Sequence, residues 1–111
     1  MNEPCEKCRT VLQELSTPAQ VGLRIVLVPE GLRAGLARYI VHGIKPGQFL
    51  CAVLDNDLSE ACSRADDQNR DKLFDIHFWL YNQGPAAAWG GREQRLAWQA
   101  ARQRDPRECG L

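Results

Sequence analysis

The chain has 111 residues, with 14 basic and 14 acidic side chains and a formal net charge of zero. Apolar residues make up 44% and charged residues 25%, which is typical of one globular domain and excludes wholesale disorder. The zero net charge argues against bulk electrostatic capture of nucleic acid or of an anionic membrane. No stretch approaches the roughly 20 apolar residues of a membrane span. The N-terminus, MNEPCEKC, lacks the apolar core of a secretory signal, so we expect a cytoplasmic protein.

Residues 1–28 form an N-terminal segment with a CxxC motif, Cys5 and Cys8, and an apolar run over 21–28. The run, VGLRIVLV, is rich in β-branched residues and predicts a short strand. A single strand leaves its backbone groups unpaired, so three arrangements stay open. The strand pairs with residues 9–15 as a hairpin, pairs with another chain in a dimer, or is an extended segment packed across helices.

A helix is predicted over 29–42, because Pro29 suits the first helical position and Gly43 suits the C-terminal cap. Residues 47–65 also keep helical spacing. They form either one helix or two, with a break near Asp55 and Asn56, because Asp57 followed by Glu60 three residues later resembles a capping box.

The central helix is predicted over 66–82, DDQNRDKLFDIHFWLYN, the densest block of large apolar residues in the chain. Helical spacing places six residues of this block in one stripe, with Ile76 at its edge. They are Leu73, Phe74, His77, Phe78, Leu80 and Tyr81. Asp66 is expected to cap this helix, and Asp71 and Asp75 to lie on its solvated side. So wide a stripe must be covered by several neighbours at once.

A last helix is predicted over 92–104, with Leu96, Ala97, Ala100 and Ala101 as its buried side. The fold class is therefore mostly α. We expect a compact bundle of four to five helices over 29–105, with at most a short N-terminal β element before it and a tail over 106–111.

From about Pro29 to Gly91, four segments occur in a distinctive order: RYIVHGIKPGQFLCAVLDNDLSEACSRAD, DQNR, LYNQGP and WGG. In this order and spacing, the chain resembles a family of small phage- and prophage-encoded proteins over roughly half its length. It departs from that family at Gly91, where a serine often follows the WG. The resemblance implies a source, a mobile genetic element, and small proteins of that source commonly act by binding.

The CxxC pair, Cys5 and Cys8, is half of a structural zinc site. The second half is missing, because the other three cysteines are isolated and neither His42 nor His77 has a ligand at zinc-finger spacing. Assembly with a distant residue such as Cys109 stays open. We therefore predict no metal and no cofactor. A redox role is disfavoured because the motif does not open a clear helix in a thioredoxin-like unit.

Catalytic patterns are absent from the sequence. There is no Walker loop, no HExxH and no dinucleotide-binding glycine motif. His77 could meet Cys51 or Cys62 as a Cys–His pair, but a core histidine without a catalytic partner is the favoured interpretation. We expect a protein that is not an enzyme.

Candidate binding residues come from the aromatic and arginine side chains of the last two helices. Arg95, Trp98 and Arg102 share one helical face, which could stack a base, anchor an interface, or simply be arginine stems along a half-buried tryptophan. Trp79 projects from the polar side of the central helix. The full predicted set is Trp79, Tyr81, Asn82, Trp89, Arg92, Arg95, Trp98 and Arg102.

Taken with the resemblance, the missing catalytic pattern and the Trp- and Arg-rich last helix favour a phage accessory protein that binds a host protein in the host cytoplasm, and inhibition of a host defence system is one version of this function. One alternative is an oligomeric nucleotide sponge that uses Tyr81, Trp89, Arg92 and Arg95. The other is a nucleic-acid-binding regulator that uses the C-terminal arginines. A homodimer or higher oligomer is plausible, because segregated charge could favour head-to-tail association, although two solvated helix faces are the favoured interpretation of that charge. Residues 55–75 hold seven carboxylates against three bases, and residues 92–107 hold five arginines against two acids.

Overall fold

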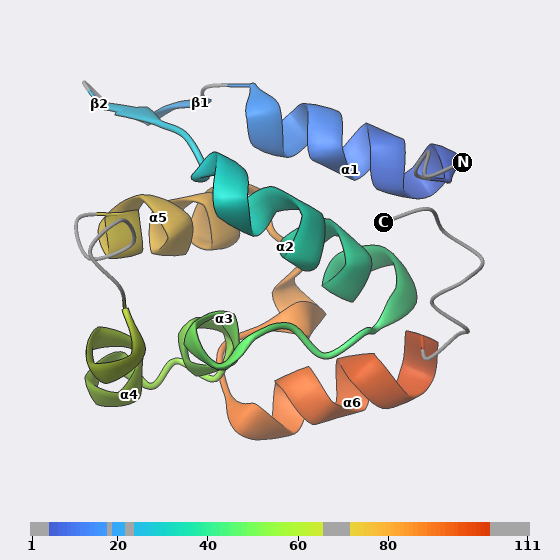
Figure 1. Cartoon of the computed structure of the whole chain (residues 1–111), viewed down its shortest axis with the longest axis vertical. Helices are drawn as coiled ribbons and strands as arrows, with labels where there is room; N and C mark the ends of the chain where they lie inside the picture. The colour runs from blue at the N-terminus through green and yellow to red at the C-terminus, as the bar shows by residue number, and fades with distance from the viewer. Residues whose placement is uncertain (1–4, 18, 22–23, 66–71, 103–111) are drawn as a thin grey trace.

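The computed structural model describes residues 5–17, 19–21, 24–65 and 72–102. These residues are mostly helical, as predicted from the sequence. Six α-helices are present in them: α1 (Glu6–Ser16), α2 (Glu30–His42), α3 (Gln48–Leu54), α4 (Leu58–Arg64), α5 (Leu73–Gln83) and α6 (Arg92–Arg102). A 3-10 helix, η2 (Ala86–Ala88), lies between α5 and α6, and two strands, β1 (Ala19–Val21) and β2 (Arg24–Val26), follow α1 (Figure 1). The predicted count of four to five helices is too low.

Helix α1 runs alongside α2 on one side of the molecule, and α6 packs on the other side of α2 (Figure 1). Leu15 of α1 and Val28, just before α2, are fully buried. The N-terminal segment is therefore part of the packed structure over its described residues, and the start of α1 lies near the end of α2 (Figure 1).

In place of one strand over 21–28, the structure has two strands of three residues each, and the first of them begins before that region, at Ala19. Strands β1 and β2 pair antiparallel, with Val21 opposite Arg24. The proposed hairpin with residues 9–15 is wrong, because those residues lie inside α1. After β2 the chain enters the core at Val28, which is fully buried, and α2 begins two residues later.

The C-terminal end of α2 matches the sequence prediction, and its N-terminal end lies one residue later than predicted, at Glu30. Pro29 is the N-terminal cap, and Gly43 is the C-terminal cap in the left-handed conformation, with φ of 66°. A glycine is favoured there because side chains clash in that conformation. The tight stop places His42 in the last turn of α2 and directs the chain back toward α3.

Residues 47–65 form two helices rather than one. The chain breaks at Asn56, which has φ of 58°, a conformation that asparagine tolerates better than most residues. Asp57 then caps α4, where its carboxylate accepts a hydrogen bond from the backbone N–H of Glu60 at 3.1 Å. Of the capping box predicted from Asp57 and Glu60, the half in which the Asp57 side chain caps the helix is confirmed.

The most deeply buried helix is α3 rather than α5. All six consecutive residues from Phe49 to Leu54 are buried. A helix that is apolar on every side must be surrounded, and α3 contacts both α4 and α6. The prediction that 66–82 is the central element is therefore wrong, because α3 is short and its run of apolar residues looked like one half of a longer amphipathic helix.

Helix α5 buries only part of the predicted stripe. Its buried residues are Asp75, Ile76, Trp79 and Leu80. Phe74 and Tyr81, predicted to face the core, are 51% and 74% exposed. The interpretation of Asp75 as a solvated carboxylate is also wrong. The predicted cap Asp66, and Asp71, lie outside the described residues.

Helix α6 buries a different face from the predicted one. Arg95 and Trp98 are its buried residues, whereas Leu96, Ala97, Ala100 and Ala101 are exposed. The reason is that Trp98 carries far more apolar area than the alanines, and its burial outweighs theirs.

Candidate functional site

An apolar groove with a volume of about 520 Å³ lies between α3, α4 and α5. Leu58 of α4, 68% exposed, and Phe74 of α5, 51% exposed, line it. The lining is Ala52, Val53, Asn56, Asp57, Leu58, Ala61, Leu73, Phe74 and His77. Leu73, Phe74 and His77 belong to the apolar stripe that the sequence places on the helix of 66–82. The groove thus exposes part of the face that was expected to be covered.

The floor of the groove is made by α3, because Ala52 and Val53 are buried and belong to the core. One wall is held by the cap at Asp57, which fixes the start of α4. The other wall includes Phe74, whose ring lies 4.3 Å from that of Phe78 between centroids. The site therefore has a rigid floor and apolar walls.

His77 lies in this groove and not in a catalytic pair. Its ring meets Trp89 edge-on, with centroids 5.2 Å apart. Cys51 instead donates its thiol to the carbonyl of Pro46 at 3.4 Å, and burial raises the pKa of that thiol. A raised pKa keeps the thiol protonated and less nucleophilic. Cys62 is exposed on α4.

The predicted binding residues of α5 and the loop after it are not brought together as one site. Trp79 is only 3% exposed, so it is a core residue and not a surface anchor. Tyr81 is 74% exposed, and Asn82 is exposed with its amide donating to the carbonyl of Phe78. Trp89 is half-buried against His77.

The predicted residues of α6 form a structural cluster instead. The indole N–H of Trp98 donates to the carbonyls of Tyr39 and Ile40 at 3.1 and 3.2 Å. Arg102 stacks on the indole, with its guanidinium carbon 3.4 Å from the ring centroid. These contacts hold α6 against α2, so the interpretation as arginine stems along a buried tryptophan describes them best.

Arg95 is only 5% exposed and forms an ion pair with Asp55 at the end of α3. Its third nitrogen donates to the side chain of Gln99 at 2.7 Å. The hydrogen bond to Asp55 raises the pKa of the guanidinium, which stays charged. Arg95 is therefore committed to holding α3 and α6 together.

A second, more polar depression of about 300 Å³ lies beside this ion pair. Its charged lining residues are Lys45, Asp55, Asp57, Glu60, Arg64, Arg92 and Arg95. Positively and negatively charged side chains are mixed along this lining, and Arg64 already forms an ion pair with Glu60 at 2.7 Å. So mixed a lining does not favour a phosphate or a nucleotide.

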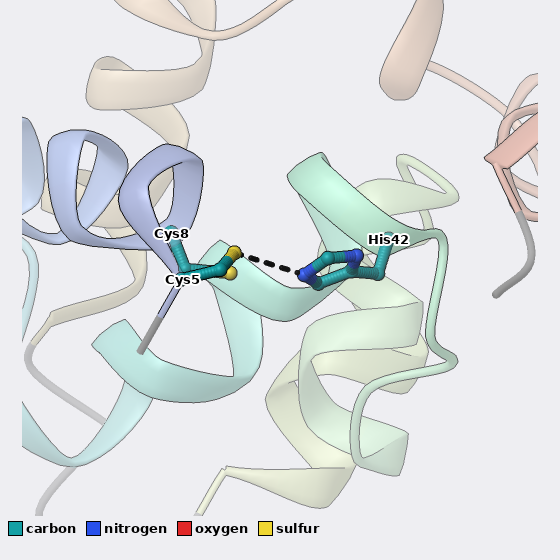
Figure 2. Close-up of side chains that lie close together, drawn as sticks. All are labelled: Cys5, Cys8 and His42. Carbon is teal, nitrogen blue, oxygen red and sulfur yellow. Dashed lines mark hydrogen bonds between the residues drawn. The ribbon is translucent and has the colours of Figure 1, made fainter. Parts of the chain in front are cut away.

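A third feature joins residues that are far apart in the sequence. Cys5, at the N-terminal cap of α1, and Cys8, in its first turn, lie beside His42 at the end of α2 (Figure 2). The Sγ atom of Cys5 lies 3.3 Å from Nε2 of His42. The three donor atoms all lie within 4.8 Å of one another. The CxxC motif does open a helix, contrary to the sequence analysis.

Sequence reasoning missed His42 as a partner of the two cysteines. No spacing rule links Cys5 to a residue 37 positions later. The available signals were local: a CxxC at a helix start, and a histidine in the last turn before a glycine cap. Only the antiparallel packing of α1 and α2 brings them together (Figure 1).

Comparison with protein-family models, with curated proteins and with solved structures gave no match to this chain. Among the described helices, none combines the length and the apolar character needed to cross a membrane. The groove and the cysteine–histidine cluster are therefore the features that bear on function.

Proposed function

We propose that the protein acts by binding a host protein, without catalysing a reaction, and that the groove between α3, α4 and α5 is the docking surface. The observation that carries this proposal is the groove itself, with Leu58 and Phe74 exposed along it. Large apolar side chains around a preformed concave surface are the usual basis of helix-in-groove recognition.

The energetic reason is the apolar area that a partner would remove from water. Fully burying a leucine or phenylalanine side chain is worth about 1.5–3 kcal/mol. Leu58 and Phe74 together would supply much of the affinity of a weak to moderate complex. The buried residues of the floor, Ala52 and Val53, need no rearrangement before binding.

The charge around the groove favours a basic partner. Among the described residues that line the groove, the charged one is Asp57. We therefore infer that the occupant is an amphipathic helix with an apolar face flanked by lysine or arginine. A host protein met in the host cytoplasm is the partner that the resemblance to phage and prophage proteins suggests, and a component of a host defence system is one version of that partner.

Site-specific photo-crosslinking tests this proposal. A benzophenone amino acid is placed at Leu58, inside the groove, or at Leu96, an exposed leucine of α6 that does not line it. The two proteins are irradiated in host lysate, and the cross-linked peptides are identified by mass spectrometry. We expect the Leu58 position to capture one host protein through a basic amphipathic helix, and the Leu96 position not to capture it.

The identified partner is then titrated against purified variants. Leu58→Glu is expected to weaken binding by at least about tenfold, since it places a charge among apolar contacts. Leu96→Glu is expected to leave the affinity unchanged. Cross-links from Leu58 to a second copy of the chain, to residues of the same chain, or equally from both positions would overturn the proposal.

A further inference from the structure

The start of α1 and the end of α2 place two thiols and an imidazole around one point (Figure 2). We propose that Cys5, Cys8 and His42 bind a zinc ion that fastens α1 to α2. This metal site is separate from the groove and does not depend on the proposed function, since none of the three residues lines the groove.

The spacing of the donor atoms fits zinc after small side-chain adjustments. Zinc binds thiolate sulfur at about 2.3 Å and imidazole nitrogen at about 2.0–2.1 Å in a tetrahedral arrangement, so its ligand atoms lie roughly 3.3–3.8 Å apart. The Sγ atom of Cys5 is already 3.3 Å from Nε2 of His42. All three donor atoms fall within 4.8 Å of one another, and Figure 2 shows both sulfurs on the side facing the imidazole.

The backbone places both sulfurs at the N-terminal end of α1. Cys5 is the N-terminal cap of α1 and Cys8 lies in its first turn, where the helix dipole stabilises negative charge. The CxxC spacing lets both side chains turn to the same side of one helical turn. Zinc binding would release the two thiol protons to solvent, so the affinity is expected to fall as the pH is lowered.

Burial of the imidazole is a further feature of the site. His42 is 7% exposed, and among the described residues its Nδ1 atom has no hydrogen-bond partner. A buried polar atom without a partner is costly, and a histidine is rarely placed so without a reason. Zinc would bind Nε2, the ring nitrogen that lies 3.3 Å from the Sγ atom of Cys5, and Nδ1 would remain the ring atom that needs a hydrogen-bond partner.

The position of His42 is fixed by packing and not by the metal. Gly43, directly after it, approaches α6 so closely that a Cβ atom would lie 2.8 Å from the carbonyl oxygen of Gln99. Cys8 is fully buried as well. His42 and Cys8 are therefore held by packing before zinc binds, which reduces the conformational entropy lost on binding.

The described residues supply three ligands, so a water molecule or a solute would complete the tetrahedron. Soft thiolates and an imidazole select zinc over magnesium or calcium, which take oxygen ligands. Cys109 lies outside the described residues. Cys109 is given no role in the site, and the variant Cys109→Ser is included in the test.

The test uses the full-length protein without a histidine tag, reduced and stripped of metal with a chelator. Zinc is titrated by calorimetry, and the product is weighed by native mass spectrometry. We expect one zinc per chain. Cobalt in place of zinc should give the visible bands of a tetrahedral site and the charge-transfer band of thiolate ligands. Loss of a direct ligand should weaken binding by more than the roughly 10–100-fold typical of outer-shell changes.

Cys5→Ser is the most informative variant, because serine is a preferred helix cap and cysteine is not. Without metal, it should be as stable as wild type or more stable. With zinc, wild type should gain thermal stability and Cys5→Ser should not. This reversal of order separates metal binding from a folding defect. His42→Gln is expected to lose zinc as well, whereas Cys62→Ser, at an exposed cysteine of α4, should keep it.

Several outcomes would overturn the proposal. They are no zinc binding by the wild type, unchanged affinity in Cys5→Ser or His42→Gln, or loss of zinc in Cys109→Ser. A disulfide between Cys5 and Cys8 that persists under reducing conditions would overturn it too, because a disulfide leaves no thiolates to bind the metal.

Discussion

Arg95 donates two hydrogen bonds to Asp55, from Nε to Oδ1 and from Nη2 to Oδ2, and so joins α6 to the end of α3. Both side chains are largely buried, with 7% and 17% of their surfaces exposed. The backbone N–H of Gly90 also donates to the carbonyl of Leu54, one residue before Asp55, at 2.8 Å. The end of the most buried helix is thus held by a charged contact and a backbone contact from the same later segment.

We expect Arg95→Met to lower the free energy of unfolding by about 3 kcal/mol, because it leaves the Asp55 carboxylate without its cation in a poorly solvated place. Urea unfolding followed by circular dichroism measures this. Arg92→Met, at an exposed arginine of the same helix, is the matched control and should change stability by less than about 0.5 kcal/mol.

A double-mutant cycle with Asp55→Asn tests whether the effect is that of the pair. We expect Arg95→Met and Asp55→Asn together to cost clearly less than the sum of the two single variants, since each single change leaves one unpaired charge. Strictly additive costs would show that the ion pair does not stabilise the contact between α3 and α6.

Gly43 should not tolerate alanine. Its φ of 66° disfavours any side chain, and a Cβ would also lie 3.0 Å from the Cβ of Arg102. We expect Gly43→Ala to cost about 2–4 kcal/mol, combining the left-handed backbone penalty with a clash against α6. Gly31→Ala, in the same helix with nothing within 4 Å of the new methyl group, should instead stabilise by about 0.5–1 kcal/mol. Thermal unfolding of both variants measures the two changes in stability. Equal changes would contradict the expectation that only Gly43 is too closely packed for a side chain.

Asp57 should act mainly through its helix cap. Asp57→Ala removes the acceptor for the N–H of Glu60 and is expected to cost about 1 kcal/mol. Asp57→Ser keeps a capping oxygen and should cost only a few tenths of that amount. If serine and alanine destabilise equally, as measured by urea unfolding, the cap does not set the start of α4.

What the sequence predicted well was local. Pro29, Gly43 and Asp57 act through backbone groups within four residues, so their pattern is visible without the fold. The buried face of α6 and part of that of α5 were predicted wrongly, because a helical wheel ranks residues by polarity and cannot see which neighbours exist. Arg95 looked like a surface cation, since its partner Asp55 is 40 positions away. His42 and Cys5 were separated in the same way.

The groove was missed for a related physical reason. An apolar stripe on a helix predicts that something covers it, but not whether the cover belongs to the same chain. Leu73 and Phe74 have the spacing of core residues and yet line a groove with Leu58. The break at Asn56 makes α4 a separate short helix and so sets the wall that carries Leu58 apart from the floor made by α3.

Tyr39 should make stability fall at alkaline pH. Its hydroxyl is fully buried and donates to the carbonyl of Ala88, and burial raises the pKa of the phenol well above its usual value of about 10. Above pH 10, the unfolded chain loses this proton while the folded chain keeps it. The unfolded state then binds fewer protons, so the free energy of unfolding falls by up to about 1.4 kcal/mol per pH unit.

Tyr39→Phe separates this ionisation from the hydrogen bond. At pH 7 the variant should be less stable by about 1–2 kcal/mol, because the carbonyl of Ala88 loses its donor. Between pH 10 and 11 that deficit should shrink, since phenylalanine has no proton to lose. The buried thiol of Cys51, whose pKa is also raised, weakens both proteins alike and cancels in the difference. Urea unfolding at pH 7, 10 and 11 measures the deficit. A deficit that stays constant over this range would show that the phenol ionises as readily in the folded protein as in the unfolded chain.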